Sequence, residues 1–247
     1  MIPRILVYEN NVNLGDTIQA IALSRWFTNV VGINRDANPS YSAKHPLIVS
    51  GFLYHAMAAW QPFIYAGIHI MPSERDINWF AEHGKCIGVR DPITYRRIRS
   101  AGIKAYVVGC PTLTFDRYDG PRSGEYAVDC EAPGIQMTHT IKPMRIKDQW
   151  LLANEYLDIY RKAALVHTSR LHVVLPCLAF GTPVRLVRPK KWWRRTRLSI
   201  ARDLGCKIGE ITTTDVSHYK RRYLGFLRQY VDILDTPREF VDVPEIM

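Results

Sequence analysis

Short apolar runs alternate with helical patterns along most of the chain. Several runs are rich in β-branched or aromatic residues and have the length of buried strands, namely residues 5–8, 47–49, 86–89, 106–108, 126–129, 165–167 and 184–187. Segments with helical periodicity separate most of these runs. This alternation predicts an α/β fold with parallel strands.

Capping residues and apolar spacing predict where the first helix begins. We expect Asp16 to cap it, with Gln19 at the third helical position. Ile18, Ile21 and Trp26 then fall on one apolar face, which would pack against the sheet.

Two further helices follow from the same rules. One begins at Ser73 and ends before Gly84. The other has clearer boundaries, because Asp91 is a good cap, Pro92 suits the first helical position and Gly102 follows the end.

The segment from Phe115 to Gly124 (FDRYDGPRSG) is the best candidate for a linker. Turn-forming and charged residues replace hydrophobic periodicity there, and strand and helix patterns resume on both sides. We therefore expect two α/β halves that face each other across a cleft, residues 1–118 and residues 122–247. An amphipathic helix over about residues 218–235 is expected to cross back and brace the first half.

The net charge favours an anionic partner. The chain has 247 residues, with 33 Lys and Arg against 23 Asp and Glu, which gives a formal net charge of +10. Five cysteines without a CxxC pair argue against a disulfide framework, so we expect them to be reduced and mostly buried. No apolar run is long enough to span a bilayer and no signal peptide is evident, so the expected compartment is the cytoplasm.

Four junctions between strands and helices carry residues suited to ligand binding. They are Asn13-Leu14-Gly15-Asp16, Gly88-Val89-Arg90-Asp91, Gly109-Cys110-Pro111-Thr112-Leu113 and Thr168-Ser169-Arg170-Leu171-His172. Each follows the carboxyl end of a predicted strand, which is where open α/β sheets bind ligands.

The last junction is chemically the richest. If Ser169 caps a helix, backbone N–H groups and the positive end of the helix dipole lie beside Arg170 and form a seat for phosphate or carboxylate. His172 has an ordinary pKa of about 6.5 and can exchange a proton near neutral pH. A structural histidine here, and an Arg90 that only begins a solvated helix, remain open as the simpler interpretations. Pro176 has no N–H for the carbonyl of His172, which predicts a kink or a late helix start.

Motifs of several common enzyme classes are missing from the sequence. His167 and His172 lack the spacing of a helical metal site with a carboxylate partner, so we expect no metal. A GxSxG elbow, a P-loop and a GxGxxG fingerprint are all absent. Serine hydrolase, P-loop NTPase and ordinary Rossmann dehydrogenase functions therefore lose their usual support.

Taken in order, the junctions resemble the polysaccharide pyruvyl transferase family. The resemblance is carried by NLGDTIQAIAL (residues 13–23), IGVRDPITYRRIRSAGIKAYVVGCPTL (residues 87–113) and VHTSRLHVVLPCLAFGTPV (residues 166–184). The first segment is similar to the family pattern N-x-G-D-x-x-Q. The last is similar to T-S-R-L-H followed by a helix and a G-x-P-V strand start. Together the segments extend over most of the chain.

The resemblance implies a fold of two Rossmann-like halves, similar to GT-B glycosyltransferases. It also implies a transferase of polysaccharide biosynthesis that moves pyruvate from phosphoenolpyruvate to two hydroxyls of a saccharide. In this chemistry the methylene carbon of the donor is protonated, and a sugar hydroxyl attacks the oxocarbenium-like centre. Phosphate then leaves and a second hydroxyl closes the ketal. Phosphoenolpyruvate is a substrate, and no cofactor or metal is required.

Roles for the junction residues follow from the same resemblance. His172 would be the general acid, a role that contributes roughly 10²- to 10⁴-fold to rate. The carboxylate and phosphate of the donor would be bound by Arg90, Arg170 and Ser169. The cleft on the acceptor side would be lined by Asn13, Gly15 and Asp16. Asp16 would act as a helix cap alone or also as a polar contact to the acceptor.

A basic segment with two tryptophans spans Arg185 to Arg197 (RLVRPKKWWRRTR). Such a segment is either a solvated surface or a contact with an anionic membrane, where each basic residue adds about 1 kcal/mol. We expect peripheral contact with the inner face of a membrane that carries a lipid-linked saccharide. The residues expected to make it are Arg188, Lys190, Lys191, Trp192, Trp193, Arg194 and Arg195.

Two other functions fit parts of the sequence. A GT-B-like glycosyltransferase would bind a nucleotide sugar saturably in the second half. A non-catalytic protein that binds nucleic acid through its basic charge would be retained on DNA or RNA and released steeply as salt is raised. No recognised nucleic-acid motif is present, so we do not expect nucleic acid as a partner.

Overall fold

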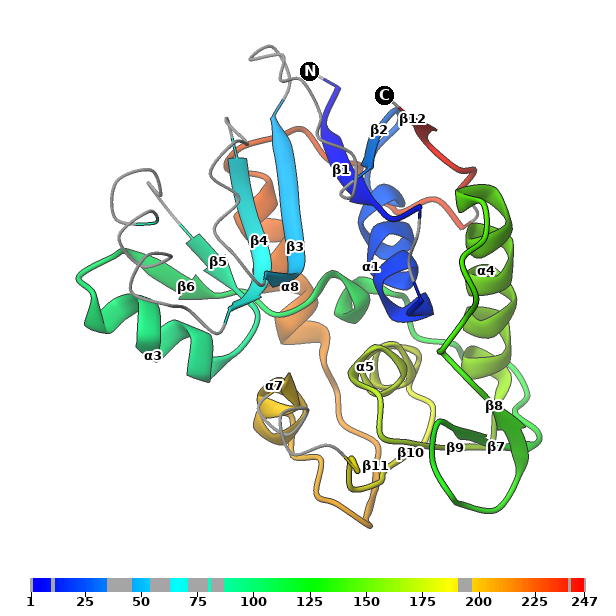
Figure 1. Ribbon diagram of the computed structural model, residues 1–247. Coiled ribbons are helices and arrows are strands. Elements are labelled where there is room, and N and C mark those ends of the chain that lie inside the picture. The colour runs from blue at the N-terminus through cyan, green and yellow to red at the C-terminus, as the bar shows by residue number, and fades with distance from the viewer. Residues whose placement is uncertain are drawn as a thin grey trace.

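The computed structural model describes residues 2–9, 12–34, 46–53, 63–70, 80, 87–190, 197–239 and 241–246 (Figure 1). Two sheets lie on opposite sides of a group of helices that contains α1 (Leu14–Ser24) and α5 (Leu171–Phe180). The two chain ends lie near each other, at the edge of the first sheet where β12 pairs with β2.

The first sheet has seven parallel strands in the order β12-β2-β1-β3-β4-β5-β6. Their bounds are β1 (Arg4–Val7), β2 (Val31–Asn34), β3 (Leu47–Leu53), β4 (Phe63–Ile70), β5 (Ile87–Val89), β6 (Ala105–Val107) and β12 (Glu245–Ile246). The strand order reverses between β1 and β3. Ligands of open α/β sheets bind at the carboxyl ends of the strands beside such a reversal.

The second sheet has five strands in the order β11-β10-β9-β7-β8, and β11 is antiparallel to its neighbour. Their bounds are β7 (Glu125–Val128), β8 (Ile135–Met137), β9 (Leu165–Thr168), β10 (Val184–Leu186) and β11 (Ile211–Thr212). Helix α4 (Ile146–Lys162) connects β8 to β9, and α5 connects β9 to β10. The order of this sheet reverses between β7 and β9, so the residues after these strands lie at a second point suited to ligand binding.

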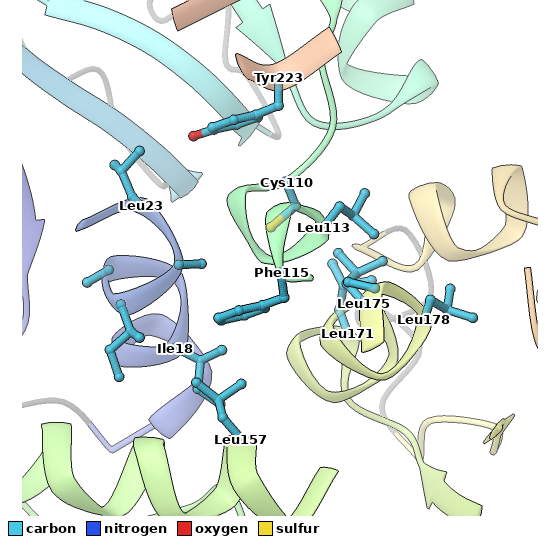
Figure 2. Packing of buried hydrophobic residues seen from close by; sticks show 14 of the residues in the cluster. Ile18, Leu23, Cys110, Leu113, Phe115, Leu157, Leu171, Leu175, Leu178 and Tyr223 are labelled. Atoms are coloured by element: carbon cyan, nitrogen blue, oxygen red, sulfur yellow. The ribbon is translucent and has the colours of Figure 1, made fainter. Parts of the chain in front are cut away.

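The helices between the sheets share one buried apolar core. Figure 2 shows Ile18 of α1 and Leu157 of α4 beside Phe115, which follows the 3₁₀ helix η1 (Pro111–Thr114). Tyr223 of α8 (Ser217–Leu227) reaches the same core, and its hydroxyl donates to the Ala66 carbonyl of β4 at 3.1 Å. Burial of such side chains contributes about 1.5–3 kcal/mol each. This shared core fixes α1 and α5 relative to each other.

The predicted α/β architecture, with a large parallel sheet and helices, is confirmed. Each predicted strand overlaps an observed one, namely β1, β3, β5, β6, β7, β9 and β10. The hydrophobic pattern did not identify β2, β4, β8, β11 or β12.

Helix α3 (Pro92–Ser100) begins where the sequence predicts. The Asp91 carboxylate accepts hydrogen bonds from the N–H groups of Ile93 and Thr94, both at 3.1 Å, and Pro92 occupies the first helical position. Gly102 follows the helix with a φ of 78°, a left-handed conformation that glycine adopts without strain. All of these contacts are local in sequence, so a capping rule was sufficient to predict them.

The prediction that Asp16 caps α1 is wrong. The helix begins at Leu14, with Asn13 as its N-cap residue and no capping bond from a side chain. The Leu14 N–H donates to the His139 carbonyl at 2.9 Å, a contact distant in sequence that starts the helix before Asp16. Asp16 therefore lies in the first turn, where the helix dipole favours its negative charge. Its Oδ1 accepts from Gln19 Nε2 at 3.3 Å.

The last predicted helix is shorter than residues 218–235. Helix α8 ends at Leu227, and the chain then turns to follow the end of α1. The Leu234 N–H donates to the Trp26 carbonyl at 2.8 Å instead of continuing the helix.

Other predictions have mixed outcomes. Residues 115–124 form neither helix nor strand, as predicted for a linker, while the division into halves stays a prediction. The helix predicted from Ser73 lies outside the described residues, apart from Phe80, which is helical and buried.

The four described cysteines are free and three of them are buried, whereas Cys86 lies outside the described residues. Among the helices in the described ranges, none is long and apolar enough to cross a membrane.

Candidate functional site

A small cavity lies where segments that follow strands of both sheets come together. Its volume is about 80 Å³. It is lined by the start of α1, by residues after β5, β8 and β9, and by the segment before α7 (Ser199–Asp203). The lining residues are Asn13, Asp16, Arg90, His139, Ser169, Arg170, Leu171, His172, Arg197 and Leu198. They include every residue predicted for acid, donor and cleft roles except Gly15, which contacts His172.

Arg90 brings a buried positive charge to this cavity. It follows β5 directly, and its backbone N–H donates to the Ile68 carbonyl at 2.8 Å. The residue is only 1% exposed, and burial lowers the pKa of its guanidinium. Its Nε and Nη2 atoms have no hydrogen-bond partner among the described residues. A buried charge without such partners is costly, so this guanidinium is well suited to bind an anion.

The neighbouring Asp91 does not neutralise Arg90 at close range. Its Oδ2 lies 3.9 Å from Arg90 Nε but 2.5 Å from His69 Nδ1. Thr94 Oγ1 also donates to this Oδ2, at 3.1 Å, and Oδ1 accepts the helix-capping bonds. Burial alone would raise the pKa of Asp91, but the hydrogen bond and charge of His69, together with Arg90, hold it well below its usual range. The carboxylate is therefore committed mainly to helix α3 and His69.

Arg170 is held differently. It follows β9 and is the N-cap residue of α5. Its Nε donates to Asp129 Oδ2 at 2.7 Å, and its Nη2 donates to Thr140 Oγ1 at 2.7 Å. Its side chain is 17% exposed, and the pairing with Asp129 compensates its charge. Three arginines thus line the cavity: Arg90, whose Nε and Nη2 have no hydrogen-bond partner among the described residues, Arg170, which is fixed by Asp129, and Arg197, which precedes α7.

His172 lies in the first turn of α5, where the helix is distorted. Its φ and ψ of −81° and 19° interrupt the helix, as the lack of an N–H on Pro176 predicts. The ring packs against α1 at Gly15, because a Cβ at Gly15 would lie 2.9 Å from both Cβ and Nδ1 of His172. Only glycine allows this close approach. His172 Nε2 is buried and has no hydrogen-bond partner within the described part of the chain.

The imidazole of His172 is neutral near pH 7. Burial is the largest cause that lowers its pKa well below the ordinary value, and Arg90 lowers it further. His139, Arg197 and Arg170 act in the same direction. Burial and the surrounding cations disfavour a proton on this ring, and negative charge from a ligand would favour one.

The prediction that Ser169 caps α5 is wrong. Arg170 is the N-cap residue, and Ser169 Oγ instead donates to the Asp129 carbonyl at 3.1 Å. Ser169 still lines the cavity, but its hydroxyl ties the segment after β9 to the segment after β7. This partner lies far away in the sequence, so a local capping rule did not reveal it.

Sequence reasoning missed His139 and Asp129, which follow the adjacent strands β8 and β7. His139 Nε2 lies 2.6 Å from Tyr160 Oη, and the His139 N–H donates to Asp129 Oδ2 at 3.0 Å. Burial lowers the pKa of His139 to about 3, so its ring is neutral. Recognition of β8 (IQM) would have identified His139 as a residue near the carboxyl end of a strand.

Asn13 and Thr140 join the two strand-following segments at this cavity through an isolated antiparallel bridge. The Ile141 N–H donates to the Val12 carbonyl at 3.1 Å in the same pairing. This bridge connects the segment before α1 with the loop that holds Arg170.

Several predicted residues lie elsewhere. His167 is buried in β9, where its Nε2 contacts the Glu125 carboxylate. Arg188 is exposed, and exposed Lys190 pairs with Glu131 at 2.6 Å. The remaining residues predicted to touch a membrane, Lys191, Trp192, Trp193, Arg194 and Arg195, lie outside the described residues. Within the described ranges, no group of three or more His, Cys, Asp or Glu side chains is placed to hold a metal ion.

A larger cavity of about 570 Å³ lies at the other ends of α1 and α5. Ile21 and Arg25 line it near the end of α1, and Phe180 lines it at the end of α5. Several of its charged residues pair with one another. Arg25 Nη2 lies 3.1 Å from Asp116 Oδ2, and the carboxylate of Asp158 accepts from Arg161 and Lys162 at 2.7 Å each.

The chain is similar to known proteins in sequence pattern and in fold. A family model for polysaccharide pyruvyl transferase matches residues 62–191. A search of curated proteins gives no significant match. An uncharacterised protein from Klebsiella pneumoniae subsp. pneumoniae has a similar fold, with a TM-score of 0.55 and 18% identity over 81% of this chain and 88% of that one. A Listeria monocytogenes protein described as a UDP-N-acetylglucosamine 2-epimerase has a TM-score of 0.40 and 11% identity over 92% of this chain and 88% of that one.

Proposed function

The chain belongs to the polysaccharide pyruvyl transferase family, and on that basis we propose that it transfers pyruvate from phosphoenolpyruvate to two hydroxyls of a saccharide. The products are a cyclic ketal and phosphate. The family itself indicates a transferase that modifies polysaccharides. The donor and the ketal chemistry rest on the residues around the small cavity.

One observation carries this proposal: Arg90 is buried, lines the cavity and lacks hydrogen-bond partners for Nε and Nη2 in the described chain. Phosphoenolpyruvate carries a phosphate and a carboxylate close together on three carbons. Guanidinium groups match both anions, so Arg90 and Arg170 are the donor-binding residues. A cavity of about 80 Å³ favours a compact anion over a nucleotide sugar, because sites for larger ligands usually exceed about 300 Å³.

The donor also supplies the negative charge that His172 needs to become an acid. In the absence of ligand, burial and the surrounding cations keep His172 neutral. A bound dianion offsets these cations and raises the pKa of His172, so the ring takes up a proton as the donor binds. This proton then goes to the methylene carbon, and the π electron pair of the donor forms the new C–H bond.

The remaining steps balance the reaction. One saccharide hydroxyl forms a C–O bond to the cationic carbon, and phosphate leaves with the electron pair of its own C–O bond. The second hydroxyl then closes the ring. Of the two hydroxyl protons released, one returns to His172 and the other leaves with phosphate. Asn13 and Asp16, at the edge of the cavity contributed by α1, are the acceptor-side contacts, and Gly15 allows α1 to approach His172.

The arrangement of the chain fits this function. We propose that the two sheets belong to two Rossmann-like halves, residues 1–118 and 122–247, in a GT-B-like arrangement. Helix α8 and strand β12 return to the first sheet. Arg188 and Lys190 are exposed, which agrees with contact between this basic segment and an anionic membrane that presents a lipid-linked acceptor. Liposome flotation tests that contact, and equal absence of binding to anionic and neutral lipid would disprove it.

A screen of saccharide acceptors with phosphoenolpyruvate tests the reaction. We expect phosphate release only with an acceptor present, together with a product whose mass increases by one pyruvate ketal. Parallel reactions with nucleotide sugars test the rival glycosyltransferase function. Glycosyl transfer without pyruvyl transfer would reject our proposal.

A further inference from the structure

Asp129 follows β7 at the point where the strand order of the second sheet reverses. It has a φ of 52°, in the left-handed region that few residues other than glycine adopt. Its N–H donates to the Met137 carbonyl at 3.1 Å, and its own carbonyl accepts from Ser169 Oγ at 3.1 Å. Asp129 therefore connects the segments that follow β7, β8 and β9.

The carboxylate of Asp129 makes three further bonds at this junction. Oδ1 accepts from Thr138 Oγ1 at 2.7 Å. Oδ2 accepts from the His139 N–H at 3.0 Å and from Arg170 Nε at 2.7 Å. Burial alone would raise the pKa of Asp129, but the bonds from Thr138, Arg170 and His139 lower it, so the carboxylate is ionised near neutral pH.

We propose that Asp129 is a positioning residue, which holds the Arg170 guanidinium in the orientation that receives the anionic donor. This inference rests on the proposed function. The bonds from Nε to Asp129 and from Nη2 to Thr140 fix the plane of the guanidinium and leave Nη1 for a ligand. A long Arg side chain otherwise loses much rotational freedom when it binds an anion, and Asp129 removes that freedom beforehand.

Arg90 and Arg170, two of the three arginines that line the cavity, thus have different tasks. Arg90 is buried, with the Asp91 carboxylate 3.9 Å from its Nε and no hydrogen-bond partner for Nε and Nη2 among the described residues, so it supplies charge. Arg170 is partly exposed and its charge is paired with Asp129. Its contribution to the site is therefore the fixed orientation of its guanidinium. Removal of the Asp129 carboxylate increases the net positive charge of the cavity. A purely electrostatic role for Arg170 therefore predicts tighter donor binding in the variant, whereas a positioning role predicts weaker binding.

Asp129→Asn is the test variant, because asparagine has a similar size and tolerates the left-handed backbone. Glu131→Gln is the matched control, since it removes one negative charge nearby from an exposed pair with Lys190. Calorimetric titration with phosphoenolpyruvate should show a Kd about tenfold higher in Asp129→Asn and unchanged in Glu131→Gln. In assays with acceptor, KM for the donor should rise while kcat changes less than about twofold. Wild-type or tighter binding in Asp129→Asn, or an equal loss in Glu131→Gln, would overturn the inference.

A second variant and a second measurement keep the test independent of folding and of the proposed function. Asp129→Gly also tolerates the backbone conformation, and it should show the same rise in Kd if Asp129→Asn does not fold. In ¹H–¹⁵N spectra, the Nε–H of Arg170 should exchange slowly in the wild type and in Glu131→Gln, and rapidly in Asp129→Asn. Slow exchange in Asp129→Asn would refute the positioning role. If this exchange pattern holds but the wild type binds no phosphoenolpyruvate, the proposed function fails while Asp129 still positions Arg170.

Discussion

The two cavities at opposite ends of α1 differ in size and in how their charges are balanced. The larger one, about 570 Å³, is lined by charged residues that pair with each other, such as Arg25 with Asp116. The smaller one, about 80 Å³, encloses Arg90, whose Nε and Nη2 lack hydrogen-bond partners in the described part of the protein. Helix α1 spans about 16 Å between them.

This difference shows that volume alone does not identify a site in this protein. Ion pairs at a surface groove satisfy their own charges and contribute little to stability or to recognition. A buried guanidinium with donors that lack hydrogen-bond partners in the described chain is unfavourable until an anion binds, and the binding energy of that anion includes the relief of this cost. The smaller cavity is therefore the better candidate for a functional site.

Replacement of His172 should have the largest effect on the reaction. In His172→Gln, kcat should fall by roughly 10²- to 10⁴-fold because the positioned acid is lost, and donor binding should lose only the part of its affinity that is linked to protonation of His172. His218→Gln is the control, since His218 is exposed on α8. Steady-state assays with donor and acceptor measure both variants. Normal turnover in His172→Gln would show that His172 is not the general acid.

Replacement of Arg90 should separate function from stability. In Arg90→Met, KM for the donor should rise by about 100-fold, because the buried cation is lost. The free energy of unfolding should increase by about 1 kcal/mol, since an apolar side chain replaces a buried charge without hydrogen-bond partners for Nε and Nη2 in the described residues.

Arg96→Met, on the exposed face of α3, changes the same charge and should leave KM unaltered. Urea denaturation and donor titrations measure both quantities. An Arg90→Met protein that is less stable than the wild type would show that Arg90 has a structural role.

Replacement of Gly15 should displace the acid without removing it. A methyl group at this position would lie 2.9 Å from His172, so the ring must shift, and we expect kcat to fall about tenfold with donor binding nearly unchanged. Gly225→Ala is the control, because a Cβ there meets nothing within 4 Å. Equal turnover of the two variants would show that the close approach of α1 is unimportant for catalysis.

Donor binding should be linked to proton uptake in the smaller cavity. The pKa of His172 is lowered in the absence of ligand and raised by a bound anion, so the complex holds more protons than the free protein. Affinity for phosphoenolpyruvate should therefore increase as pH falls toward the ordinary pKa of histidine. Calorimetry in buffers of different ionisation enthalpy should show about one more proton taken up by the wild type than by His172→Gln. Identical proton uptake would contradict the proposed charging of His172.

Replacement of Arg25 in the larger cavity should have the smallest effect on activity. Arg25→Met removes the pair with Asp116 and the bond from Nε to the Arg238 carbonyl at 2.7 Å. The free energy of unfolding should fall by about 1 kcal/mol, while KM and kcat stay within about twofold of the wild type. Chemical denaturation and steady-state assays measure these changes. A large loss of donor binding would show that phosphoenolpyruvate binds in the larger cavity.

Sequence reasoning worked where the determining contacts are local. Asp91 and Pro92 define the start of α3 through bonds within three residues, and Pro176 predicted the distortion at His172. The caps proposed at Asp16 and Ser169 failed because their segments bond to residues far away in the sequence.

The same distinction explains which cavity residues were found. Arg90 and His172 lie at junctions whose flanking strand or helix patterns were clear. His139 was missed because β8 is short and mostly exposed, so its hydrophobic pattern is weak, whereas Asp129 lay inside the predicted strand 126–129 and was not singled out. Their place in the site depends on the pairing of β7 with β8 and β9, which no local pattern encodes.

A crystal structure of the protein with phosphoenolpyruvate tests the central claim most directly. We predict the donor in the smaller cavity, with its anionic groups on Arg90 and Arg170 and its methylene carbon beside His172. Phosphoenolpyruvate bound in the larger cavity, with the smaller one unoccupied, would contradict the account.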